Sequence, residues 1–242
     1  MSLADDIAAW IRTIVHDAEA EGLVLGLSGG IDSAVTAALA QRAFRRKVLG
    51  VILPCESEPQ DAEDARLVAN TLDIETAEAD LTPAYQALLE VLPEGDRLAR
   101  ANIKPRLRMT SLYYFAATRS YLVCGASNRT EIAMGYFTKY GDSAVDLMPI
   151  GGLLKYEVRE LARQLAIPQR IIDKPPSAGL WPGQTDEDEL GMSYGQLDLA
   201  LRAMATKDPT AMPAPALSRV REAMRASEHK RRLPPIYVPP KR

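Results

Sequence analysis

The 242-residue chain predicts a single α/β domain in which a parallel sheet carries helices on both faces. Short apolar segments of the kind found in buried parallel strands alternate with amphipathic helical segments along most of the chain. No repeat or linker divides the sequence, and its 47% apolar and 25% charged residues suit one globular domain with a sizeable core. Right-handed crossovers between successive strands would then place helices on both sides of the sheet.

The N-terminal half alternates helices and strands in the order that a parallel sheet requires. Apolar residues recur at helical spacing over 5–20, and Gly22 ends that helix ahead of an apolar strand at 23–27. A Ser-Gly-Gly turn separates this strand from an alanine-rich helix. Further strands are predicted at 48–53, 74–79 and 121–125, and further helices at 31–44, 60–72, 83–92 and 98–117.

The C-terminal half departs from this alternation. A helix is predicted at 153–165, an extended segment at 168–172 and a short last helix at 217–226. The 173–192 segment, DKPPSAGLWPGQTDEDELGM, is rich in Pro, Gly and acidic residues, and we expect a long mobile loop there. The tail at 219–242 is basic, a pattern typical of a solvated end, a nucleic-acid arm or a clamp on a phosphorylated ligand.

Charge, hydropathy and cysteine content argue against several classes of protein. The net charge of −3 disfavours a general affinity for nucleic acid. No apolar run approaches the length that crosses a bilayer, and the acidic N-terminus lacks the pattern of a secretory signal. Cys55 and Cys124 lie far apart without a CxxC spacing, so neither a disulfide framework nor a zinc site is predicted. We therefore expect a cytoplasmic protein with reduced thiols and neither a nucleic-acid nor a membrane partner.

The SGGIDS segment from Ser28 to Ser33 is the sharpest functional motif of the chain. It follows a predicted strand and opens a helix, so that backbone N–H groups, two serine hydroxyls and the positive helix end would surround an anion. The pattern matches neither a Walker loop nor a Rossmann dinucleotide turn. The prediction is a pyrophosphate cradle, in which Asp32 makes sense if it holds Mg²⁺ against the phosphates. The alternative is a helix with Ser28 as its N-cap and Asp32 in its first turn.

SGGIDS resembles the phosphate loop of the N-type ATP pyrophosphatases, which split ATP into AMP and pyrophosphate while activating a carboxyl or carbonyl oxygen. Further blocks resemble the NAD+ synthetases of that superfamily, in the family's order, to about residue 232. These blocks are NIKPRLRM at 102–109, GASNRTE at 125–131, GYFTKYGD at 135–142, Asp146, Pro149, Lys155, 174–177, 186–187 and EHKR at 228–231. The resemblance implies one adenine nucleotide alpha-hydrolase-like, Rossmann-like domain over 1–242.

The resemblance also implies a role for each matched residue. Asp32 and Lys155 would be catalytic, with Lys155 neutralising phosphate charge as pyrophosphate departs, and Asp32 and Glu131 would hold Mg²⁺. The implied ATP-binding residues are Gly26, Leu27, Ser28, Gly29, Gly30, Ile31, Asp32, Ser33, Ala126, Lys155 and Ser177. The residues implied for deamido-NAD+ are Arg106, Lys139, Asp146, His229 and Lys230, with Asn102 and Tyr113 as weaker candidates.

Taken singly, several of these residues have an ordinary explanation. Arg106 on a helix is typical of a surface charge, and Glu131 suits a first-turn helix acid. His229 suits a structural or exposed histidine, and Lys230 a solvated tail. Lys155 near a helix start opposes the helix dipole, which favours a functional reason for it.

Two positions depart from the family pattern. Ala126 stands where relatives usually have Thr, which removes a hydroxyl expected near the adenine nucleotide. Gly152 replaces a frequent Asp. Because neither position would carry the chemistry, we expect altered affinity for the nucleotide and retained activity.

The implied activity is that of a ligase that forms a C–N bond, with ATP as co-substrate and Mg²⁺ as cofactor. The nicotinate carboxylate of deamido-NAD+ would attack the α-phosphate of ATP, and ammonia would then attack the acyl-adenylate, giving NAD+ and AMP. The chain begins about one helix before its phosphate loop, so we expect no glutaminase domain and free ammonia as the nitrogen donor. The alternative of a separate glutaminase subunit stays open. The resemblance further implies a homodimer.

Two alternatives to this activity stay open. One is another N-type ATP pyrophosphatase that amidates or modifies a different acceptor, such as a transfer RNA. The acidic net charge and the missing RNA-binding appendage count against it. The other is a non-catalytic nucleotide-binding protein of the same fold, against which Asp32, Glu131 and Lys155 count.

Overall fold

A computed structural model describes residues 2–206 and 212–239, and it confirms the predicted parallel sheet. The described residues form one sheet with the order β3-β2-β1-β4, in which every pairing is parallel. Its strands are β1 (Gly22–Gly26), β2 (Val48–Ile52), β3 (Glu75–Glu78) and β4 (Tyr121–Val123). The chain reverses its direction of winding between β1 and β4. In open α/β sheets, ligands bind in the crevice outside the carboxyl ends of strands at such a point.

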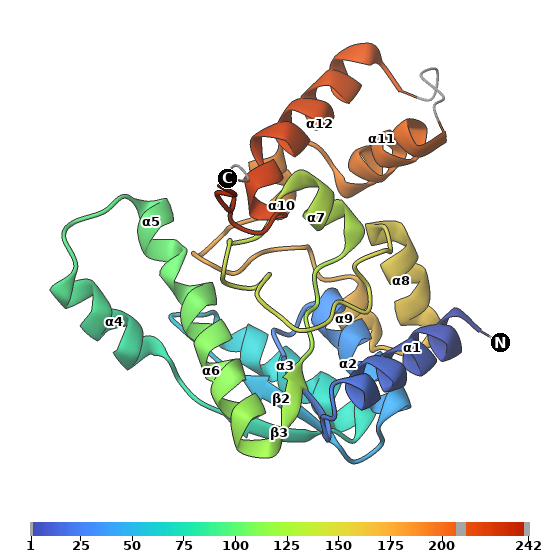
Figure 1. Cartoon of the computed structure of the whole chain (residues 1–242), viewed down its shortest axis with the longest axis vertical. Helices are drawn as coiled ribbons and strands as arrows, with labels where there is room; N and C mark the ends of the chain where they lie inside the picture. Colours follow the sequence, from blue (N-terminus) through green and yellow to red (C-terminus); the bar gives the residue numbers. More distant parts are fainter. Residues whose placement is uncertain (1, 207–211, 240–242) are drawn as a thin grey trace.

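Helices cover both faces of the sheet, as the sequence predicted (Figure 1). Alternate residues of β1 point to opposite faces, with Leu23 and Leu25 in one core and Val24 in the other. The first core packs the sheet against α1 (Leu3–Asp17), α2 (Ile31–Ala43), α3 (Pro59–Leu72), α8 (Lys155–Gln164) and α9 (Gln169–Ile172). The second core packs the other face against α6 (Ile103–Arg119).

The helix predicted at 98–117 is two helices, α5 (Arg97–Ala101) and α6, which meet at Asn102. Pro105 has no N–H to donate to the Ala101 carbonyl, so the backbone ladder cannot run unbroken through this point. The Asn102 side chain accepts a hydrogen bond from Thr138 Oγ1 at 2.7 Å. This break leaves α4 (Thr82–Val91) and α5 as an outlying pair at one side of the molecule (Figure 1).

A second group of helices lies beyond the sheet and has its own core (Figure 1). It consists of α7 (Arg129–Met134), α10 (Asp186–Leu190), α11 (Tyr194–Thr206) and α12 (Ala214–Ala226), followed by the 3-10 turn η2 (Glu228–Lys230). The sequence reasoning predicted the last of these helices and missed α7 and α11. Two capping residues, Asn128 and Thr185, begin α7 and α10 respectively.

Two predictions about the C-terminal half are wrong. The segment at 168–172 is not extended but forms α9, because Pro168 at its N-cap is already held at a φ of −53°. The 173–192 segment is not irregular throughout, since it contains α10, which Gly191 ends in the left-handed conformation with a φ of 63°. The mobility of the 173–192 segment stays a prediction.

Two further observations concern the ends and the hydropathy of the chain. Lys241 and Arg242 of the predicted basic tail lie outside the described residues, as does Met1. Within the described part, none of the helices combines the length and the apolar character that a membrane crossing requires.

Candidate active site

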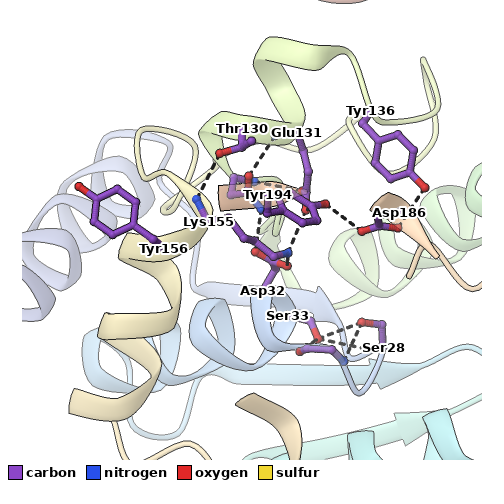
Figure 2. Close-up of polar contacts among 12 residues, drawn as sticks. Ser28, Asp32, Ser33, Thr130, Glu131, Tyr136, Lys155, Tyr156, Asp186 and Tyr194 are labelled. Atoms are coloured by element: carbon purple, nitrogen blue, oxygen red, sulfur yellow. Dashed lines mark hydrogen bonds and ion pairs between the residues drawn. The ribbon is translucent and has the colours of Figure 1, made fainter. Parts of the chain in front are cut away.

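The Ser28–Ser33 motif, called the phosphate loop here, runs from the turn after β1 into the first turn of α2 at the carboxyl edge of the sheet (Figure 2). Ser28 Oγ lies 3.0 Å from Ser33 Oγ and accepts a hydrogen bond from Gly30 N at 3.3 Å. Gly29 has a φ of +76°, and a Cβ at this position would lie 2.5 Å from the Asp61 carbonyl oxygen. The loop is therefore tightly built and requires glycine at Gly29.

The helix that follows this loop begins without a side-chain cap. The N-cap of α2 is Gly30, and no side chain of the described residues caps it. The alternative that Ser28 serves as the N-cap is therefore wrong. Because the first N–H groups of α2 have no intrahelical partner, they suit an anion that reaches this edge.

Lys155 lies at the centre of the site and is only 2% exposed. Its Nζ forms ion pairs with Asp32 Oδ2 and, at 3.2 Å, with Glu131 Oε1 (Figure 2). The ring of Tyr194 is centred 4.7 Å from the same nitrogen. Asn128 Nδ2 donates to the other oxygen of Asp32 at 2.9 Å. A single buried ammonium is thus shared by two carboxylates from different parts of the chain.

Local structure explains how Glu131 and Lys155 meet. Asn128 and Glu131 form a capping box at the start of α7, which fixes the Glu131 side chain. Lys155 is the first residue of α8, and its backbone N–H donates to Thr130 Oγ1 at 3.2 Å. Thr130 in turn donates to Asp198 Oδ1, which belongs to α11. Two helix N-termini are therefore joined beside the sheet edge.

Burial and charge act in opposite directions on these groups. Burial raises the pKa of Glu131 to about 7, although the Lys155 ammonium opposes this shift. Burial also lowers the pKa of Lys155, but Asp32 and Glu131 outweigh it, and the net pKa lies above the usual range of a lysine. The ammonium therefore stays charged in the buried site.

A cavity of about 530 Å³ opens at this edge, a size typical of small-ligand sites. Most of the predicted site residues line it: Gly26, Leu27, Ser28, Gly30, Ile31, Asp32, Ser33, Asn102, Ala126, Glu131, Lys155, Ser177 and Lys230. Gly29 does not line the cavity but packs behind the loop against Asp61 and Asp64. The structure thus brings the predicted phosphate loop, the carboxylates and Lys155 together around one space.

The chain matches the family model described as NAD synthase over residues 3–234. It belongs to the NAD synthase family. An NH(3)-dependent NAD(+) synthetase of Carboxydothermus hydrogenoformans is 49% identical over 237 residues, which cover 96% of this chain and 95% of the relative. One of Methanocaldococcus jannaschii is 44% identical, over 96% of this chain and 95% of that relative.

Solved structures agree with this assignment. A structure of NMN synthetase from Francisella tularensis has a TM-score of 0.90 and 38% identity, with 97% of each chain covered. An NH3-dependent NAD synthetase from Campylobacter jejuni, in complex with the nitrate ion, has a TM-score of 0.86 and 28% identity. The match covers 98% of this chain and 100% of that one. These matches confirm the predicted fold class and the resemblance to the NAD synthase family.

The remaining residues predicted to bind the dinucleotide lie outside the cavity lining: Arg106, Tyr113, Lys139, Asp146 and His229. Arg106 Nη2 donates to the Lys139 carbonyl at 3.2 Å, and Tyr113 OH donates to Asp146 Oδ1 at 3.0 Å. Arg106 and Tyr113 both belong to α6. His229 is exposed in η2. The structure places the first four in two pairs along α6, apart from the Lys155 cluster, and their role in this member of the family stays a prediction.

Lys230 and Arg231 of the basic tail do not belong to a free solvated end. Lys230 Nζ donates to the carbonyl oxygens of Gly135 and Phe137, at 2.8 and 2.9 Å. Arg231 Nη1 donates to the carbonyls of Ile132 and Ala133, each at 3.1 Å. These cations meet the carbonyl end of α7 and the residues after it, where the helix dipole favours positive charge.

Sequence reasoning missed several polar residues around the site. Lys174 Nζ, which lines the cavity, donates to Asp61 Oδ1 and Asp64 Oδ2 at 2.7 Å each. Tyr194 and Asp198 both belong to α11 and both contact the Lys155 cluster. Their spacing of four residues places both on one helix face, which was the available signal, but α11 itself was not predicted.

Proposed function

We propose that this chain is an ammonia-dependent NAD+ synthetase, as its relatives are named. In this reaction ATP adenylates the nicotinate carboxylate of deamido-NAD+, and ammonia displaces AMP to form the amide of NAD+. The observation that supports it most is Lys155, a buried ammonium at the rim of the nucleotide-sized cavity beside the Ser28–Ser33 loop. A permanent charge there suits a reaction whose difficult step separates pyrophosphate from an acyl-adenylate.

Each part of the site has a separate task in this proposal. The N–H groups at the start of α2, with the hydroxyls of Ser28 and Ser33, bind the phosphates of ATP. Lys155 neutralises the charge that develops on the departing pyrophosphate. Ala126 and Ser177 line the same cavity and contact ATP. The 173–192 segment keeps water away from the adenylate, which water would otherwise hydrolyse.

The carboxylates of Asp32 and Glu131 fit a Mg²⁺ site. Both are hard oxygen donors beside the phosphate loop, and Mg²⁺ is commonly held by one or two carboxylates together with substrate phosphates. No group of three or more His, Cys, Asp or Glu side chains suited to a metal occurs among residues 2–206 and 212–239. The bound ion would neutralise phosphate charge, while Asp32 and Glu131 also hold Lys155 in place.

We also propose that the active form is a homodimer whose second copy helps to enclose the dinucleotide. The exposed Arg106 meets the half-buried Lys139 outside the cavity, so a partner surface over α6 would make both residues part of a site. Tyr114 of α6 is 68% exposed and would be covered by that partner. Sedimentation equilibrium tests this, and a fully active monomer would contradict it.

A cytoplasmic location also belongs to the proposal. Cys55 and Cys124 are both buried free thiols, which agrees with a reducing compartment. Cell fractionation with an antibody against the chain tests the location.

A second candidate acceptor is nicotinate mononucleotide. The observation that favours it is the likeness to the Francisella tularensis NMN synthetase, at 38% identity and a TM-score of 0.90. Both acceptors present the same nicotinate carboxylate, so the Lys155 cluster serves either. The two differ in the adenylate half, which the mononucleotide lacks.

One assay separates these proposals. Purified protein is mixed with ATP and Mg²⁺, with deamido-NAD+ or nicotinate mononucleotide as acceptor, and with ammonium or glutamine as the nitrogen source. We expect NAD+ and AMP from deamido-NAD+ with ammonium alone. A faster reaction with the mononucleotide would favour the second candidate. Formation of AMP without either amide would support adenylation but indicate a different acceptor. No turnover with any combination of acceptor and nitrogen source would favour a non-catalytic nucleotide-binding protein.

A further inference from the structure

Asp186, the first residue of α10, is the side chain through which the 173–192 segment reaches the Lys155 cluster. It is 4% exposed, and its Oδ2 accepts a hydrogen bond from Tyr194 OH at 2.8 Å (Figure 2). Its Oδ1 lies 3.0 Å from Tyr136 OH, whose one proton is shared with Glu189 Oε2 at 2.7 Å. A carboxylate this deeply buried is costly without such donors. The two tyrosines belong to parts of the chain outside the segment, so Asp186 links the segment to the rest of the site.

Tyr194 continues this link toward the ammonium. It is 1% exposed, and its hydroxyl lies 3.2 Å from Glu131 Oε1, the oxygen that pairs with Lys155 Nζ. Because a phenol has one proton, Tyr194 donates to only one of the two carboxylates at a time. The shorter distance favours Asp186 while the segment is docked. Removal of Asp186 leaves Glu131 as the acceptor for that proton.

We propose that Asp186 is a positioning residue, which acts through the Tyr194 hydroxyl to set how Glu131 holds Lys155 when the 173–192 segment covers the cavity. Its place in catalysis rests on the proposed function. The geometry of the Glu131 and Lys155 pair would then depend on the position of the 173–192 segment, which excludes water. A site built in this way reaches its working arrangement only when it is covered.

Docking of the segment itself has other supports. Lys104 Nζ donates to the Leu180 carbonyl at 3.0 Å, and the Arg97 guanidinium lies 4.4 Å from the centre of the Trp181 ring. Lys174 pairs with Asp61 and Asp64 at the start of the segment. These contacts do not involve Asp186, so we expect the segment to stay docked when Asp186 is changed.

The test is a double-mutant cycle with Asp186→Asn and Tyr194→Phe, two changes that keep side-chain size. The neutral amide is a weaker acceptor than the carboxylate, and the phenylalanine removes the shared proton. Asp188→Asn is the matched control, because Asp188 lies in the same helix and its hydrogen bonds are to Thr185 of its own cap. Thermal unfolding of all four proteins verifies that each is folded.

We expect each single change to lower kcat about ten-fold, the effect typical of one hydrogen bond to a charged group. We expect the double variant to lie within about two-fold of the slower single variant, since both changes break one link. KM for the acceptor should change less than two-fold. Multiplied losses in the double variant, or a Tyr194→Phe variant with wild-type kcat, would overturn the proposal.

Fluorescence of Trp181 provides a readout independent of turnover. Trp181 lines the cavity, and Trp10→Phe removes the other tryptophan of the chain. We expect Tyr194→Phe to keep the fluorescence response to ATP and Mg²⁺, because the segment still docks. Loss of that response would mean that Tyr194 acts on docking, against the proposal. If the wild type forms no amide, the proposed function fails. ATP affinities of the same four-member cycle, measured by calorimetry, then test the link from Asp186 through Tyr194 to Glu131. Non-additive changes in affinity would support this link, and additive changes would overturn it.

Discussion

The phosphate loop and the Lys155 cluster face the same cavity, but the chain builds them in opposite ways. The loop is local: Ser28 and Ser33, five positions apart, bond to each other. The cluster is assembled from distant segments, and its central pair of Lys155 and Asp32 is 123 positions apart. Asp32 belongs to both regions, since it lies in the loop motif and pairs with the ammonium.

The difference has a physical consequence for each region. A local loop is destabilised when a substitution strains the backbone at a single residue, because its shape depends on φ values that few residues tolerate. An assembled cluster is destabilised when one charged group is lost, because its partner then remains buried with an uncompensated charge. Four predictions test this contrast.

The largest effect is expected from Lys155→Met, which removes the buried cation and leaves Asp32 and Glu131 facing each other. We expect NAD+ formation to fall about 10²–10³-fold, the range found when one electrostatic group of an active site is lost. Steady-state kinetics measure the loss. Lys155→Arg, which keeps the charge, separates a charge effect from misfolding, and thermal unfolding checks each variant.

The matched control for this change is Lys47→Met. Lys47 is an exposed lysine that pairs with Glu21 at 3.7 Å on the surface. We expect its kcat within two-fold of the wild type, because exposed pairs contribute little. Retained activity in Lys155→Met would show that the ammonium is structural.

Gly29→Ala tests the local loop. The new Cβ would stand 2.5 Å from the Asp61 carbonyl at a φ of +76°, so both clash and backbone strain oppose it. We expect a loss of about 1–3 kcal/mol in the free energy of unfolding, measured in urea, and weaker ATP binding by calorimetry. Gly152→Ala is the control, since a Cβ there meets no atom within 4 Å. Equal stability of the two variants would contradict a strained loop.

The dependence of stability on pH tests the assembled cluster. Burial raises the pKa of Glu131 from 4.5 to about 7, so the folded protein keeps a proton that the unfolded chain releases in that interval. Stability therefore falls as the pH rises from 4.5 to 7, by about 1–3 kcal/mol, and changes no further above it through this group. Urea unfolding without ATP measures the fall.

The control for the pH prediction is Glu131→Gln, which removes the titrating group. We expect its stability to change less than that of the wild type across the same interval. An identical pH dependence in the two proteins would assign the fall to other groups.

The contrast also explains which parts of the molecule the sequence predicted. The parallel sheet and the phosphate loop follow from short-range patterns, namely apolar runs of strand length and the spacing of Ser28, Gly29 and Asp32. Asp32, Glu131 and Lys155 were grouped by a resemblance between families, because no local pattern joins residues that far apart. Their hydrogen-bond partners Tyr194 and Asp198 were missed, since α11 carries no cap or periodicity that was recognised.

Other misses have local causes. The segment at 168–172 was predicted to be extended, although Pro168 stands at a position where proline also begins helices. The break at Asn102 follows from Pro105, although one continuous helix was predicted at 98–117. In both places the local signal was a proline.

The smallest effect is expected in the tail, where two adjacent arginines differ in their contacts. Arg231 donates to the Ile132 and Ala133 carbonyls at the end of α7, whereas Arg232 is 72% exposed and pairs only with Glu228 among the described residues. We expect Arg231→Ala to lower the free energy of unfolding by about 1–2 kcal/mol, because it removes the hydrogen bonds that a half-buried guanidinium donates to the carbonyls at the end of α7. Arg232→Ala should cost less than about 0.5 kcal/mol. Equal effects would mean that Arg231 adds charge to the surface without stabilising the end of α7.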